Sequence, residues 1–107
     1  MAAGLLGKQL TNAGSYTTVY TVPASGVQFA TVFINAVNTG TADAKINVGV
    51  TTASTPGAGE FLDYQIPLTA SGAPYEYPCL VMGPGEKVMV YSDQSTVAVR
   101  VHGIEQS

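Results

Sequence analysis

The sequence predicts an all-β protein, a single antiparallel β-sandwich of about seven to eight strands. Thirteen valines and twelve threonines among the 107 residues supply the β-branched side chains that suit a pleated strand. Turn-forming Gly, Pro, Asn and Ser recur between short apolar runs, and no long window has helical apolar spacing. An immunoglobulin-like sandwich and a jelly roll both fit this pattern, so the strand order stays open.

Each strand is expected between two turn clusters. The turns are predicted at residues 23–26, 38–40, 56–59, 70–72, 83–85 and 92–94. The strands beside them are predicted at residues 15–22, 27–37, 44–52, 60–68, 74–82, 86–92 and 96–104.

Several of these runs alternate between apolar and polar residues, as half-buried strands do. In the run 44–52, the apolar side chains on one face oppose Lys45, Asn47 and Gly49 on the other. The core-facing residues predicted from this alternation are Ile46, Val48, Val50, Val97, Val99 and Val101.

The run 27–37 is apolar on both of its faces. Phe29, Phe33 and Val37 share one face, and Val32 and Ile34 lie on the other. A strand of this kind is either covered twice, once by the core and once by another partner, or is a central strand with small side chains toward solvent.

Residues 1–14 differ from the remainder, residues 15–107, which form the predicted sandwich domain. Leu5, Leu6 and Leu10 are spaced without a strict period among Gly, Ala and Gln. This segment is either an N-terminal arm that contacts a neighbouring subunit or an edge strand. If it is an arm, its removal should leave a folded domain that no longer binds its partner. The three leucines are therefore candidate interface residues.

The composition favours contact with other protein. Only 10% of the residues are charged, against about 25% in an average soluble domain. Few charges are available to protect exposed strand edges, which suggests that sister copies or another subunit cover them. The four cations are scattered and the net charge is −3, which argues against nucleic acid and against an anionic membrane.

No catalytic, cofactor or metal site is predicted, so we expect a non-enzymatic protein. His102 is the only imidazole and lies on the polar side of its strand, where a surface or interface role is expected. Cys79 is the only cysteine, which rules out a disulfide within the chain and a zinc site built from one chain. It is expected to be a small buried hydrophobe.

Two tyrosines, Tyr75 and Tyr77, stand out between two prolines in the run 74–82. Their spacing places both rings on one face of a strand, and the prolines suit an edge position. Tyrosine is enriched at interfaces, so both are candidate interface residues. The alternatives are a place in the sandwich core and a sugar-binding platform.

Three segments together resemble a known group of proteins. They are Tyr-Thr-Thr-Val-Tyr-Thr-Val-Pro-Ala at 16–24, Asn-Thr-Gly within 32–46, and Gly-Pro-Gly-Glu-Lys-Val at 83–88 followed by the valine-alternating run 97–103. This set is similar to small β-sandwich virion proteins of tailed phages, frequent among phages of cyanobacteria. The turns at 38–40 and 84–86 also resemble those of immunoglobulin-like adhesion modules.

The phage resemblance implies a virion component made in the host bacterial cytoplasm. A capsid decoration or cement protein that stabilises the head shell is favoured. Its expected partners are further copies of itself, with a trimer favoured, and the major capsid protein or another virion subunit. A tail, neck or baseplate component and a carbohydrate-binding or adhesion module are the alternatives.

Overall fold

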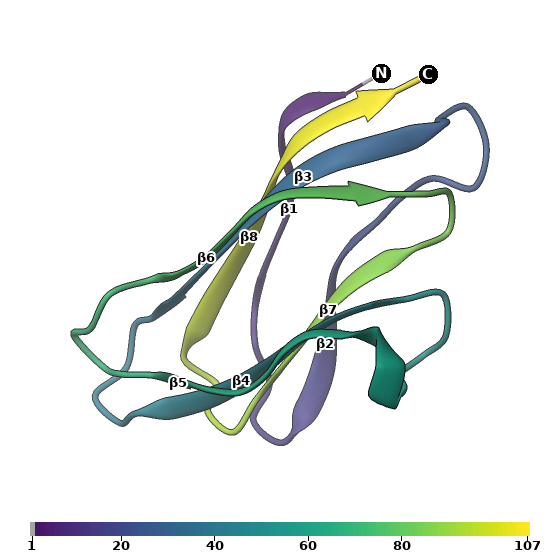
Figure 1. Ribbon diagram of the computed structural model, residues 1–107. Coiled ribbons are helices and arrows are strands. Elements are labelled where there is room, and N and C mark those ends of the chain that lie inside the picture. The colour runs from purple at the N-terminus through teal and green to yellow at the C-terminus, as the bar shows by residue number, and fades with distance from the viewer. Residues whose placement is uncertain (1) are drawn as a thin grey trace.

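The computed structural model of the chain describes residues 2–107, and almost every element in it is a β-strand (Figure 1). Met1 of the predicted N-terminal segment lies outside the described residues. The only helical element within this range is the short 3-10 turn η1, Ala58–Glu60. The strands are β1 (Ala3–Leu10), β2 (Ser15–Thr21), β3 (Phe29–Asn38), β4 (Ala44–Thr51), β5 (Phe61–Leu68), β6 (Tyr75–Met82), β7 (Lys87–Ser92) and β8 (Val97–Gln106).

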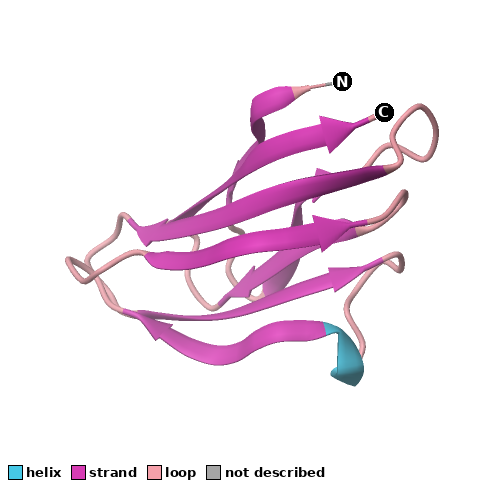
Figure 2. Cartoon of the chain, turned by 45° about the horizontal axis from the view of Figure 1, so that its top comes forward, coloured by secondary structure: helices cyan, strands magenta, loops and turns pink. Residues whose placement is uncertain are grey.

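The strands form two antiparallel four-stranded sheets, which confirms the predicted sandwich (Figure 2). Sheet A has the order β1-β8-β3-β6 and sheet B the order β2-β7-β4-β5. The pairs β1–β8, β2–β7, β3–β6 and β4–β5 are nested around the β4–β5 connection. This nesting is that of one long hairpin rolled into two sheets, and it defines the fold as a jelly roll rather than an immunoglobulin-like sandwich.

The core lies between the sheets and is built largely from valine. The alternation predicted for β4 and β8 is confirmed, because Ile46, Val48, Val97, Val99 and Val101 are fully buried. Sheet-forming valines from β7 and the apolar side of β3 meet them from both layers. The other fully buried large side chains of this core are Val22, Val32, Ile34, Met82, Val88 and Val90.

The outer face of sheet B is partly covered by the chain itself. Asn47 and Gly49 point away from the core, yet both are buried. The loop after β4 covers Gly49, where a Cβ atom would lie 2.8 Å from Cγ of Pro56. Asn47 is instead hydrogen-bonded to Gln65 and Tyr16. Part of the outer side of β4 is therefore buried, although Lys45 on the same side is exposed, and the alternating sequence does not reveal this.

Residues 3–10 form an integral edge strand of sheet A and do not extend away from the domain. β1 pairs with β8 from Ala3 to Leu10, and the two termini lie side by side (Figure 1). Leu6 packs against the core, and the buried Thr11 donates its hydroxyl to the carbonyl of Gln94 at 2.8 Å. Of the two alternatives for this segment, the described residues 3–10 therefore take the edge strand. Because removal of residues 1–14 would expose one side of β8, we expect the truncation to destabilise the domain.

Bulges interrupt the pairing of all four edge strands. The register shifts between β1 and β8, β2 and β7, β3 and β6, and β4 and β5, whereas the central pairs β3–β8 and β4–β7 run without a shift. Bulges twist an edge and weaken its ability to pair with another chain. The bulges thus give the chain some protection of its own at all four strand edges.

Candidate docking face

The outer surface of sheet A, here called face A, gathers most of the exposed apolar side chains. Residues on β8 that point away from the core lie opposite outward residues of β3, as in the pairs Phe33–His102 and Val37–Ala98. Seven large hydrophobic side chains are exposed among the described residues, and six of them lie on the strands of this sheet. These six are Leu5, Leu10, Phe29, Val37, Val81 and Ile104.

Their exposure is high for residues of this kind. Val81 is 63% exposed, Leu10 56% and Ile104 52%. Because Thr31 lies between Val81 on β6 and Ile104 on β8, the two exposed side chains flank one position of the central strand β3. Exposed apolar side chains gathered on one face mark interaction sites in soluble proteins.

The centre of face A contains a hollow of about 290 Å³. Phe33, Cys79, His102 and Ile104 line it together with backbone of the neighbouring strands. Cys79 is exposed there, so the expectation of a buried cysteine is wrong. Its backbone has a φ of 57° and lies in the bulge of β6 between Tyr77 and Leu80. The bulge breaks the inward–outward alternation, and this explains why the sequence pattern misplaced the thiol.

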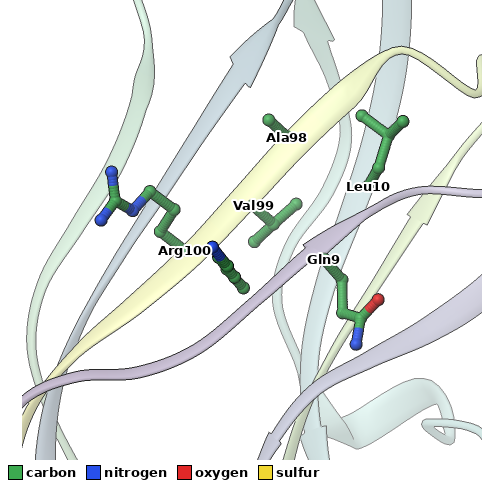
Figure 3. A pocket seen from close by; sticks show the side chains of 6 residues that line it. Gln9, Leu10, Ala98, Val99 and Arg100 are labelled. Atoms are coloured by element: carbon green, nitrogen blue, oxygen red, sulfur yellow. The ribbon is translucent and has the colours of Figure 1, made fainter.

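A second hollow, of about 410 Å³, lies where β1 meets β8 (Figure 3). Lys8 and Arg100 face each other directly across the two strands, and Leu10 and Ala98 form the next pair. Like charges placed directly opposite destabilise a sheet. A carboxylate from a partner would relieve this repulsion, so the hollow suits an acidic side chain.

Charge is distributed unevenly between face A and the remainder of the molecule. Face A carries Lys8 and Arg100 and, among the acids, Glu76, which lies opposite Asn35 on the outward side of β3. Two cations and six of the seven acids lie elsewhere in the chain. The apolar face is therefore the less acidic side of an acidic protein.

The leucines singled out from the sequence divide between two environments. Leu5 and Leu10 are exposed, and they lie opposite His102 and Ala98 on face A. Leu6 instead packs against the core. Leu5 and Leu6 are separated by the ordinary alternation of a strand. The bulge between Leu5 and Gly7 shifts the register by one residue and so places Leu10 on the same face as Leu5.

The two tyrosines singled out from the sequence point into the sandwich. Tyr75 lies opposite Ala36 and Tyr77 opposite Ile34, both of which are fully buried. Tyr75 and Tyr77 pack against this core. The Tyr75 hydroxyl donates a hydrogen bond to the carboxylate of Asp63 on β5, which links the open edges of the two sheets. Burial, and next the bond to Asp63, raise the pKa of Tyr75 well above its ordinary value.

A second internal bond of the same kind joins the two sheets near the chain termini. Tyr20 on β2 donates to Oε2 of Glu105 on β8 at 2.6 Å. Burial, and next this bond, raise the pKa of the Tyr20 phenol well above its usual range. The hydroxyls of Tyr75 and Tyr20 thus form hydrogen bonds that link the two sheets and do not face a ligand.

Sequence reasoning missed four of the residues on face A, namely Phe29, Val37, Val81 and Ile104, as interface candidates. The apolar outer side of the run 27–37, which includes Phe29 and Val37, was the sequence pattern that indicated an interface. Val81 and Ile104 join them only through strand pairing between distant segments. A periodic pattern within one strand cannot show such pairing.

Residues 2–107 hold no group of three or more His, Cys, Asp and Glu side chains placed to bind a metal ion. Within the same residues, no helix has the length and apolar character needed to cross a membrane. The fold and the docking face together define the chain as an eight-stranded jelly-roll domain with one exposed apolar sheet face. Comparisons of the chain with protein-family models, curated proteins and solved structures find no match.

Proposed function

We propose that this protein is a non-enzymatic structural subunit of a tailed-phage virion, a capsid decoration or cement protein that docks through face A. The observation that carries the proposal is the concentration of six exposed large hydrophobic side chains on the outer side of one sheet. A monomer gains nothing by exposing such a surface, whereas burial against protein stabilises an assembly. The resemblance of the sequence to small phage virion proteins supports the choice of particle.

The partners proposed for the subunit are further copies of this chain, which face A joins into a ring with a trimer favoured, and the shell beneath the ring. A face-to-face pair that stacks β1 on β1 of the second copy would bring two Lys8–Arg100 pairs together. A ring avoids this, because each copy presents face A to a different surface of the next copy. Six of the seven acids lie away from face A, so carboxylates on another surface of the next copy are available to pair with Lys8 and Arg100.

The absolute mass of the purified protein, measured by light scattering over a range of concentrations, tests the self-association. We expect a closed oligomer for the natural chain and a monomer for Val81→Asp, because the substitution places a charge in the apolar face. Thr18→Asp is the matched control, since Thr18 is an exposed outward residue on β2 of the opposite sheet. A natural chain that stays monomeric at every concentration would contradict the ring.

The position of the protein in the virion is tested separately, with particles of the phage that encodes the chain. Saturable binding of the purified protein to isolated heads, lost in Val81→Asp and kept in Thr18→Asp, is the expected result. Binding to isolated tails without binding to heads would favour the tail, neck or baseplate alternative.

A further inference from the structure

The outer surface of sheet B carries a cluster of four aromatic rings that comes from three strands. Tyr16 on β2 lies opposite Tyr91 on β7, with ring centroids 5.4 Å apart. Phe61 on β5 is 6.4 Å from Tyr16, and Tyr64 is 4.9 Å from Phe61 in an edge-to-face arrangement. No pair of these rings is close in sequence except Phe61 and Tyr64, so the cluster could not be recognised before folding.

The cluster is held in place from beneath. The buried Asn47 accepts a hydrogen bond from the backbone N–H of Gln65 at 2.7 Å. Its amide nitrogen lies 3.4 Å from the Tyr16 hydroxyl, to which it donates. Gln65 has a φ of 56°, and this turn in the strand lies directly after Tyr64. The backbone that carries the outermost ring is therefore fixed by a side chain of the neighbouring strand.

Beside the outermost ring lies a hollow of about 280 Å³ lined by Ala58, Phe61 and Tyr64. Tyr64 is 61% exposed and is the one large exposed hydrophobic side chain of the described residues that does not belong to sheet A. The three lining residues are uncharged. The Tyr64 hydroxyl supplies a polar group to this lining, and the next residue along the strand, Gln65, is exposed.

This combination fits a sugar better than a protein side chain. A pyranose ring presents a flat face of C–H groups to an aromatic ring and hydroxyl groups to polar neighbours around it. A protein interface would need a wider apolar surface, and the exposed apolar side chains of this molecule are on the other sheet. The uncharged lining favours a neutral sugar over an acidic one.

We propose that Tyr64 and Phe61 form a binding site for a neutral pyranose unit of a polysaccharide. The site uses the sheet opposite to face A and does not depend on the docking function. It replaces Tyr75 and Tyr77, which point into the core, as the aromatic platform of this fold. Tyr64 and Phe61 are not part of face A, so contacts made by face A do not use them.

Affinity electrophoresis in gels that contain laminarin, hydroxyethylcellulose or galactomannan tests the site. We expect the natural chain to be retarded by at least one of these neutral polysaccharides. Tyr64→Ala should bind about tenfold more weakly, because it removes the stacking ring. Tyr64→Phe should keep most of the retardation, and Val81→Ala, on the opposite sheet, should keep all of it.

Urea unfolding of each variant separates loss of the site from loss of the fold, since the exposed Tyr64 contributes little to stability. Two outcomes would overturn the proposal. One is a natural chain that none of the three neutral polysaccharides retards. The other is a Tyr64→Ala variant that is retarded as strongly as the natural chain. Neither outcome depends on the oligomeric state, because Val81→Asp can be run in the same gels.

Discussion

At the scale of single residues, the buried hydroxyl of Thr17 lowers the stability of the fold. It lies opposite the fully buried Val90 on the inner side of β2, and its hydroxyl is buried without a hydrogen-bond partner. Thr17→Val replaces the hydroxyl by a methyl group of similar size, and we expect the free energy of unfolding to rise by about 1 kcal/mol. Chemical denaturation measures this change. Thr18→Val, at the exposed neighbouring position, should be close to neutral, and an equal gain in both variants would point to β-propensity instead.

Tyr75 makes the stability of the fold depend on pH in the alkaline range. Its pKa in the folded state is raised by burial and by the bond to Asp63, so folding favours the neutral phenol. The stability from this group is fully present below the unfolded pKa of about 10 and is lost as the pH rises through the raised folded value. Tyr20 acts in the same direction.

Urea unfolding between about pH 8 and pH 11 tests this linkage. The free energy of unfolding of the natural chain should fall with pH at the upper end, and the fall should be less steep in Tyr75→Phe. At neutral pH the same variant should be less stable by about 1–3 kcal/mol, since the Asp63 carboxylate loses a donor. An identical alkaline slope in the two proteins would exclude Tyr75 as the group responsible.

At the scale of elements, β1 is fixed by its close contact with β2. A Cβ atom at Gly7 would lie 2.1 Å from the carbonyl oxygen of Val19, which is backbone and cannot move away. Gly7→Ala should therefore lower the free energy of unfolding by about 1–3 kcal/mol. Thermal or urea unfolding measures the loss. Gly59→Ala is the control, because nothing lies within 4 Å of its Cβ position, and a tolerated Gly7→Ala would contradict the tight packing of β1.

The seven strands from β2 to β8 could be predicted from the sequence because each one alternates or is apolar between two turn clusters. β3, predicted at 27–37, is Phe29–Asn38, and β8, predicted at 96–104, is Val97–Gln106. β1 could not be assigned firmly, since Gly4 has a φ of 99° and the bulge after Leu5 interrupts its alternation. The jelly-roll order also lay beyond the sequence, because it depends on pairing between the two halves of the chain.

The candidate site could be predicted only where one strand carried the signal by itself. The apolar outer side of β3 and the exposed Leu5 and Leu10 belong to face A. Tyr75 and Tyr77 were correctly placed on one strand face, but spacing alone cannot say which face meets the core. The aromatic cluster around Tyr64 forms only when three strands come together, so no single segment of the sequence predicts it.

At the scale of the whole molecule, the two outer faces differ in character. Face A is apolar and carries two of the four cations, whereas the outer side of sheet B is covered by a loop only near Gly49 and carries aromatic rings among polar groups. A small domain with one apolar face and one ring-bearing face is suited to attach to an assembly on one side and to meet its surroundings on the other. The bulged edges limit uncontrolled pairing of strands between copies.

The central claim, that face A is buried in an assembly, is tested most directly at Cys79. It is the only cysteine of the chain, it is exposed, and it lines the central hollow of face A. The measurement is the rate constant for its alkylation by N-ethylmaleimide at rising protein concentration, in the natural chain and in Val81→Asp. We expect the rate constant to fall as the natural chain associates and to stay constant in Val81→Asp. A natural chain that associates while Cys79 stays equally reactive would contradict the claim, because its copies would then meet through another surface.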